Sequence, residues 1–442
     1  MEAMKPLQVL LIGGTGVLST AVTREALKQG IKVTMINRGR RMSIVPDGVE
    51  LIKADKDDKR TIARHLQGKQ FDAVMDFLCF TDKQTEESFN FYGNYTEQYF
   101  FISSCAVYDK TVTGTKTEDS PKGLKIWSYS LNKWASEQRL MKLAKQSSMK
   151  YTIVRPCVTY GDTRIPYGIA PQYGYHWTLV ERILHGKPII RWNGGTTRTN
   201  MMRVEDFAVG VVGLIGNPKA YNEAFNICGD ETPSFNDVLT ILGELTNKKV
   251  VTVDMPSEFY AHELPERAGE ILGGRSIDAI NSNAKIKTIV PNFKQSIPLR
   301  EGLAMTFKAY AQGTHQMGID WAFDGDCDRI IAKWCRKNGI DASGYHLCFI
   351  DYLGTATNEQ KSTYHIALHK NRFDKKIIRM IKRINSLVHR AAKKLITKIL
   401  PPLFPENSGN PCRPCHSLSQ RIMLRSGDNK LQPAGRTYLR AS

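Results

Sequence analysis

The sequence contains no apolar run that approaches the roughly 20 residues needed to cross a bilayer. Its first residues lead directly into an apolar segment at 7–13, without the apolar core and small-residue cleavage site of a secretory leader. The nine cysteines are scattered and do not form a disulfide framework. These absences predict a protein of the reducing cytoplasm that has no membrane-spanning helix.

Acidic residues are scarce near the C-terminus. Residues 370–442 hold 17 Lys and Arg against three Asp and Glu, whereas residues 1–369 hold 45 basic and 40 acidic residues. Most of the formal net charge of +19 therefore comes from the tail, residues 370–442. The charge does not indicate that the body of the protein, residues 1–369, binds nucleic acid. The Cys-x-x-Cys pair at 412–415 has no second pair, so no metal site is expected.

Short apolar runs alternate with helical patterns in the first half of the chain. The expected strands are 7–13, 32–37, 49–54, 71–77, 98–104 and 151–156. Helical patterns at 18–29 and 128–145 separate some of them, as crossovers between parallel strands require. The pattern predicts an α/β fold with a doubly wound parallel sheet of the Rossmann type.

A smaller C-terminal lobe should follow, because residues 161–199 are rich in Gly, Pro, Tyr and Trp, as in a substrate-facing loop region. The predicted dinucleotide-binding Rossmann domain comprises 1–165 and 200–230, and the predicted substrate-binding lobe comprises 166–199 and 231–369.

The tail has a pattern of its own. Apolar residues recur at helical spacing through 374–400, among charges that are nearly all basic. Residues 370–402 are therefore predicted to form a basic amphipathic helix, and 403–442 a disordered tail. The helix suits peripheral contact with an anionic membrane, but it equally suits ordinary packing or a homodimer interface.

A glycine turn follows the first expected strand. Close backbone approach to a pyrophosphate needs bare N–H groups there, and the N-terminus of the next helix adds partial positive charge. The third glycine of the usual spacing is replaced by Ser19, which is small enough for the same packing. The predicted cofactor-binding residues of this turn are Gly13, Gly14, Thr15, Gly16, Val17 and Leu18.

The end of the second strand bears on the choice between NAD and NADP. An acidic residue there would bind both ribose hydroxyls, but the sequence has Asn37 followed by Arg38. Arg38 can pair with a 2′-phosphate, which favours NADP over NAD, although a solvated basic loop is the competing interpretation. Asp55, after the third strand, is expected to meet the adenine amino group.

Tyr129 and Lys133 lie four residues apart on an expected helix, so both side chains share one face. A tyrosine with a pKa of about 10 is a poor base at neutral pH, and a neighbouring ammonium lowers that value. Lys133 is expected to do this while it holds the nicotinamide ribose. Ser104, at the carboxyl end of the fifth strand, is expected to orient the substrate oxygen.

These motifs together resemble the extended short-chain dehydrogenase/reductase superfamily, in its NAD-dependent epimerase/dehydratase branch. The matching segments are 13–16, 101–108, 129–133, 154–156 with 160–161, 202–208 and 224–229. The resemblance implies catalytic roles for Ser104, Tyr129 and Lys133, and a nucleotide-activated sugar as substrate. Arg198 and Arg203 are the candidates to hold substrate phosphates, although a surface ion pair is the competing interpretation for each.

Two departures qualify the resemblance. Cys105 and Ala106 replace the Asp-Glu pair of the sugar dehydratases, which disfavours dehydration. The stretch before the fifth strand is short and lacks a clear match to the superfamily's structural asparagine. That form is similar to a branch containing chloroplast stem-loop-binding proteins.

The sequence thus predicts an NAD(P)-dependent epimerase or oxidoreductase acting on a nucleotide sugar. The alternatives are an NADPH-dependent reductase of a non-sugar carbonyl, and an RNA-binding protein on a Rossmann scaffold. Nucleic acid as a partner is disfavoured because no aromatic-rich RNA-reading module is visible.

Overall fold

A computed structural model of the chain describes residues 5–312, 318–352, 354 and 356–370. The predicted basic helix at 370–402, apart from residue 370, and the predicted tail at 403–442 lie outside these ranges. So does the predicted membrane-contacting segment 374–400. Among the helices of the described ranges, none is both long and apolar enough to cross a membrane.

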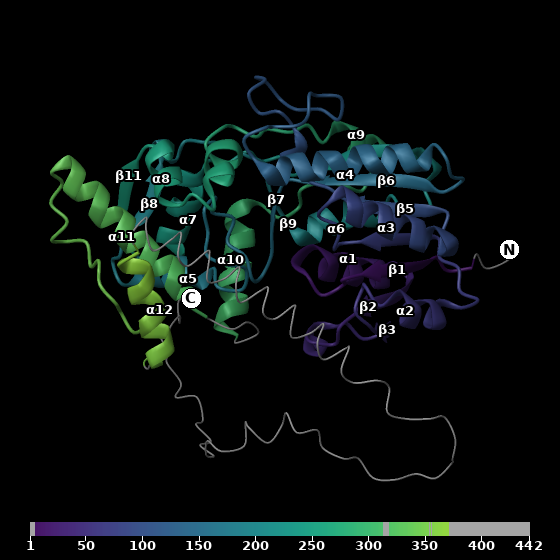
Figure 1. Ribbon diagram of the computed structural model, residues 1–442, viewed down its shortest axis with the longest axis horizontal. Coiled ribbons are helices and arrows are strands. Elements are labelled where there is room, and N and C mark those ends of the chain that lie inside the picture. The colour runs from purple at the N-terminus through teal and green to yellow at the C-terminus, as the bar shows by residue number, and fades with distance from the viewer. Residues whose placement is uncertain (1–4, 313–317, 353, 355, 371–442) are drawn as a thin grey trace, which may run out of the picture. The chain divides into compact units, whose positions relative to one another are not determined.

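A seven-stranded sheet, parallel throughout, forms the scaffold of the N-terminal part (Figure 1). Its strand order is β10-β6-β5-β4-β1-β2-β3. The strands are β1 Gln8–Ile12, β2 Lys32–Asn37, β3 Val49–Lys53, β4 Ala73–Asp76, β5 Gln98–Ile102, β6 Lys150–Pro156 and β10 Glu223–Ile227. The predicted Rossmann-type α/β fold is confirmed.

Helices cover both faces of this sheet. One face packs against α1 Val17–Lys28, α6 Val204–Val212 and α9 Ala284–Ile289; the other packs against α2 Lys59–Leu66, α3 Asp82–Tyr92 and α4 Ser128–Ala144. Along β1, Val9 and Leu11 enter the first core, whereas Leu10 and Ile12 enter the second. Burial on both faces explains why the strands are apolar runs without alternation.

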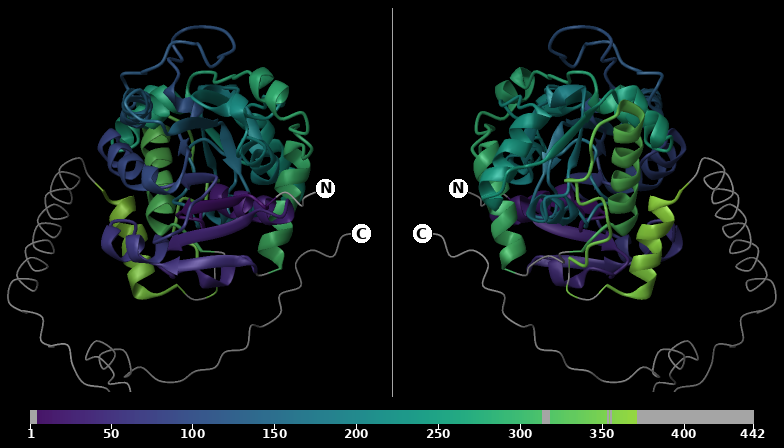
Figure 2. Two further views of the ribbon diagram at one scale, coloured as in Figure 1. Left: turned by 90° about the vertical axis from the view of Figure 1, so that its right-hand side faces the viewer. Right: turned by 90° about the vertical axis from the view of Figure 1, so that its left-hand side faces the viewer.

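A third hydrophobic core lies in the C-terminal part, which Figure 2 displays in teal and green. The helices of this part are α5 Trp177–Leu184, α7 Phe235–Thr246, α8 Ser257–Glu263, α10 Leu299–Ala311, α11 Trp321–Asn338 and α12 Asn358–Leu368. Two short parallel ladders pair β8 Ile189–Trp192 with β11 Thr252–Met255, and β7 Val158–Tyr160 with β9 Met201–Arg203. The predicted lobe boundaries stay a prediction.

Short helical turns complete the described chain. They are the 3-10 turns Met42–Ile44, Gly93–Tyr95, Cys105–Val107, Asn193–Gly195 and Pro218–Ala220, and the π-helical turn Glu270–Arg275. The turn at Cys105–Val107 begins directly after Ser104, whose hydroxyl accepts a hydrogen bond from the Ala106 amide at 3.1 Å.

A fully buried cluster of ion pairs links α11 to α5. Arg182 pairs with Asp324 and, at 3.0 Å, with Asp328, and Lys187 lies 2.8 Å from Asp324. All four side chains are 0% exposed. The hydroxyl of Tyr364 on α12 donates to Asp328 at 2.6 Å, so the cluster also holds the last described helix.

Candidate active site

The glycine turn between β1 and α1 is closed by its own hydrogen bonds. Gly13 adopts a φ of +85°, and a Cβ there would lie 2.6 Å from Leu78, so no other residue fits without strain. The buried Ser19 hydroxyl accepts from the Gly16 amide at 2.8 Å and donates to the Gly13 carbonyl at 2.9 Å. Ser19, which replaces the usual third glycine, therefore holds the turn together at the N-terminus of α1.

The ends of β2 and β3 lie beside this turn at the carboxyl edge of the sheet. The Gly13 amide donates to the Ile36 carbonyl at 3.0 Å, and the Ala54 amide donates to the Asn37 carbonyl at 2.9 Å. Arg38 and Asp55 are both exposed at this edge. Their contacts with a cofactor stay predictions.

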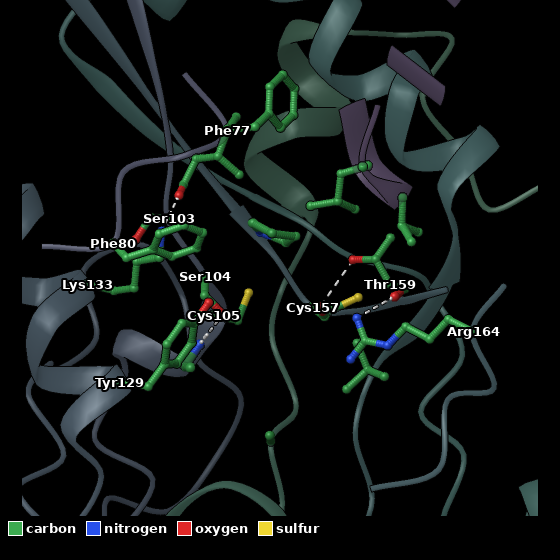
Figure 3. A pocket seen from close by; sticks show the side chains of 18 of the residues that line it. Phe77, Phe80, Ser103, Ser104, Cys105, Tyr129, Lys133, Cys157, Thr159 and Arg164 are labelled. Atoms are coloured by element: carbon green, nitrogen blue, oxygen red, sulfur yellow. Dashed lines mark hydrogen bonds between the residues drawn. The ribbon is translucent and has the colours of Figure 1, made fainter. Parts of the chain in front are cut away.

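A cavity of about 610 Å³ extends from the glycine turn to the predicted catalytic residues (Figure 3). Ser104, Tyr129 and Lys133 all line it, together with Gly13, Gly16, Val17 and Leu18. Gly14 does not line it, and Thr15 lines an adjacent hollow. A single cavity joins bare backbone at a helix N-terminus to a tyrosine, which fits a pyridine dinucleotide.

Lys133 is anchored by backbone carbonyls. Its ammonium donates to the Cys79 carbonyl at 2.8 Å and to the Ile102 carbonyl at 2.7 Å. The side chain is buried, and burial lowers the pKa of Lys133 to about 8. The ends of β4 and β5 thus fix the position of the ammonium in the cavity.

Asp76, at the end of β4, supports this anchor, and the sequence analysis missed it. Its buried carboxylate accepts from the Leu78 amide at 2.7 Å, the Ser88 hydroxyl at 2.6 Å and the Cys79 thiol at 3.2 Å. These bonds shape the turn that presents the Cys79 carbonyl to Lys133. The negative charge also favours the protonated form of Lys133.

The electrostatics of Tyr129 correct one expectation. Burial raises the pKa of Tyr129, while a hydrogen bond from Ser104 and the charges of Arg164 and Arg275 oppose that rise. Lys133, expected to supply the lowering charge, is not among the main causes, and its ammonium donates to the carbonyls of Cys79 and Ile102. Burial thus favours the neutral phenol of Tyr129 over the phenolate.

The two arginines predicted to hold substrate phosphates do not line this cavity. Arg203 is 1% exposed and pairs with Asp162 at 2.6 Å and Glu205 at 2.8 Å. The prediction for Arg203 is corrected, because a buried arginine satisfied by two carboxylates has no free face for a ligand. Arg198 is exposed, and its guanidinium donates to Thr232.

Other charged residues line the cavity instead. They are Lys110, which follows the turn after Ser104; Arg164, which follows β7; and Glu270 and Arg275, at the two ends of the π-helical turn. The sequence analysis missed them because they come from three distant segments with no common spacing. Only Arg164 lies in a segment, 161–199, that the composition marks as facing the substrate.

Comparison with known proteins gives a family for this site. The model of the NAD dependent epimerase/dehydratase family matches residues 9–94 and 90–228. A chloroplast stem-loop binding protein of 41 kDa from Arabidopsis thaliana is 24% identical over 350 residues, which cover 75% of this chain and 86% of the relative. A UDP-glucose 4-epimerase from Vibrio cholerae is 24% identical over 232 residues, which cover 50% of this chain and 65% of the relative.

Solved structures have the same fold. The UDP-glucose 4-epimerase of Thermotoga maritima with UDP-glucose has a TM-score of 0.57 at 18% identity, and covers 70% of this chain and 100% of its own. The UDP-glucose 4-epimerase of Thermus thermophilus in complex with NAD has a TM-score of 0.54 at 18% identity, with coverages of 69% and 99%. By the family model and the shared fold, the chain belongs to the NAD-dependent epimerase/dehydratase family.

Proposed function

We propose that the protein is an NAD(P)-dependent epimerase or oxidoreductase that acts on a carbinol carbon of a nucleotide-activated sugar. One observation carries this proposal: the glycine turn, Ser104, Tyr129 and Lys133 line the same cavity. The relatives named as UDP-glucose 4-epimerases support a nucleotide sugar as the substrate class.

Three residues of the cavity have separate roles near the reacting carbon. Tyr129 exchanges a proton with the substrate oxygen, and Ser104 orients that oxygen by a hydrogen bond. Lys133 would hold the ribose next to the nicotinamide, and Asp76 shapes the turn whose Cys79 carbonyl positions its ammonium. A nicotinamide ring, when bound, supplies the hydride chemistry at the carbon.

The protonation state of Tyr129 bears on whether the enzyme oxidises or reduces its substrate. A neutral Tyr129 donates its proton when a carbonyl is reduced, whereas oxidation of a carbinol requires its phenolate. A relative named 2′-dehydrokanamycin reductase, 18% identical over 260 residues, supports reductase chemistry within this family. Mass spectrometry of the dinucleotide released from purified protein separates the cases: retained NAD supports an epimerase, and exchangeable NADP supports a reductase.

The preference for NADP can be tested at Asn37. The side-chain oxygen of Asn37 accepts from the Gly39 amide at 2.7 Å, a bond that an aspartate would keep. The Asn37→Asp substitution adds a negative charge at the ribose end of the site, so we expect NADPH affinity to fall at least about tenfold because like charges repel. NADH affinity should fall little. Calorimetric titration measures both, and an unchanged NADPH affinity would refute our placement of the 2′-phosphate.

RNA binding on the same scaffold is the second candidate, favoured by the similarity to the stem-loop binding protein. Electrostatic RNA binding weakens steeply with salt. If the body binds RNA, salt-sensitive binding of a stem-loop should survive deletion of residues 370–442. Binding that disappears with the deletion assigns the contact to the basic tail instead.

A further inference from the structure

The charged side chains around Tyr129 differ in how far neighbouring groups offset their charge. The titratable groups that line the cavity together with Tyr129 are Cys105, Lys110, Lys133, Cys157, Arg164, Tyr173, Glu270 and Arg275. Burial raises the pKa of both thiols, so they are neutral and add no charge. The charges near Tyr129 therefore come from the lysines, the arginines and Glu270.

Each of the two lysines presents less than a full positive charge to Tyr129. Lys133 donates to two backbone carbonyls at the ends of β4 and β5, and the negative charge of Asp76 partly offsets its own. The ammonium of Lys110 donates to the Gly274 carbonyl at 2.7 Å, and burial lowers its pKa to about 7. Lys110 is therefore charged in only about half of the molecules at neutral pH.

Arg275 is held next to a carboxylate that it shares with a second arginine. Its guanidinium lies 3.5 Å from Glu270, and Glu270 pairs with Arg267, which does not line the cavity, at 2.9 Å. Burial alone would raise the pKa of Glu270, but the charges of Arg275 and Arg267 lower it, so Glu270 is ionised. Its negative charge belongs to the same π-helical turn as Arg275 and reduces the effect of Arg275 on Tyr129.

Arg164 forms an ion pair with no carboxylate of the described residues. Its guanidinium donates to the Thr159 carbonyl at 3.0 Å, and its side chain reaches into the cavity from the side opposite Tyr129 and Ser104 (Figure 3). An arginine stays protonated in proteins, and its charge acts more strongly in a partly buried cavity than in water. Burial raises the pKa of Tyr129, and the charge of Arg164 opposes this rise.

We propose that Arg164 is a positioning residue whose charge stabilises the phenolate of Tyr129, the role expected of Lys133 from the sequence. The proposal rests on the proposed function for the role of Tyr129 as the group that exchanges a proton with the substrate. A phenolate accepts the proton of a carbinol during oxidation, whereas the neutral phenol serves reduction. Arg164 thus supports the oxidising half of the reaction.

Difluorotyrosine placed at position 129 of the full chain tests the proposal by fluorine NMR. Its phenol is more acidic than that of tyrosine, so its ionisation can be followed while the protein stays folded, without cofactor or substrate. Arg164→Gln keeps an N–H donor for the Thr159 carbonyl but removes the charge. It should raise the midpoint of ionisation by about one pH unit, a tenfold fall in the acid dissociation constant.

Three further variants show whether the effect belongs to the charge of Arg164. Arg164→Lys keeps the charge and should shift the midpoint much less than Arg164→Gln. Lys133→Met should also shift it less, because Asp76 partly offsets the charge of Lys133. Arg191→Met, which removes a partly exposed arginine outside the cavity lining, is the matched control and should leave the midpoint unchanged.

Two results would overturn the proposal. The first is an unchanged midpoint in Arg164→Gln, or in Arg164→Met should Arg164→Gln fail to unfold cooperatively in denaturant. The second is a rise in Lys133→Met at least as large as that in the Arg164 variants, which would return the role to Lys133. The titration uses no ligand, so a failure of the protein to bind NADH and NADPH would refute the proposed function and leave this result readable.

Discussion

Replacing Tyr129 by Phe should reduce turnover by about a hundredfold to ten-thousandfold, the range that positioned general acid–base catalysis contributes. The substitution removes only the hydroxyl that exchanges a proton with the substrate oxygen. The ring stays, so its packing against Trp127 and the shape of the cavity should be preserved. Cofactor affinity should therefore stay within a factor of a few, and the loss should fall on kcat.

Tyr95→Phe is the matched control for this experiment. Tyr95 is also partly buried, but it lies before β5, at the edge of the sheet opposite the cavity. Its substitution should leave kcat unchanged. If Tyr129→Phe turns over at the wild-type rate, Tyr129 is not the proton-transfer group, and the proposed mechanism fails even though the cavity remains.

Replacing Arg182 by Met should destabilise the fold by about 3–5 kcal/mol, the usual cost of removing one partner from a buried ion pair. Arg182 is 0% exposed and donates to Asp324, Asp328 and the Pro188 carbonyl. Its loss leaves two buried carboxylates with Lys187 as the remaining cation near them. The midpoint of denaturant unfolding measures the effect.

Arg191→Met removes an arginine–aspartate pair of the same type from a partly exposed position. Arg191 and Asp254 are 28% and 52% exposed, so this substitution should cost only about 0–1 kcal/mol. A similar shift in the two variants would contradict the view that burial makes the Arg182 cluster important. Because the buried cluster joins α5, α11 and α12, we expect the larger shift of the unfolding midpoint for Arg182→Met.

Much of the fold could be predicted from local patterns in the sequence. The strand predicted at 32–37 is β2 in the structure, and the helix predicted at 128–145 is α4 to within one residue. Both were predictable because apolar runs and helical spacing are properties of neighbouring residues. The gathering of Ser104, Tyr129 and Lys133 was also predictable, since strand ends meet at one edge of a parallel sheet.

Contacts between distant segments could not be read from the sequence. Arg203 lies in a family motif, but its partners Asp162 and Thr306 come from distant parts of the chain. The orientation of Lys133 toward Cys79 depends on a turn shaped by Asp76, which is 57 residues before it in the chain. Such partners are brought together by tertiary packing. Patterns among neighbouring residues in the sequence therefore do not predict them.

The central claim is that a pyridine dinucleotide binds from the glycine turn to Tyr129. Calorimetric titration of the purified protein with NADH and NADPH tests it most directly, with Gly13→Val as the comparison, because a side chain at a φ of +85° would press on Leu78 and displace the turn. We expect saturable binding of at least one dinucleotide to the wild type, and none to a Gly13→Val protein that still unfolds cooperatively. If neither dinucleotide binds the wild type, or if the variant binds equally well, the account is contradicted.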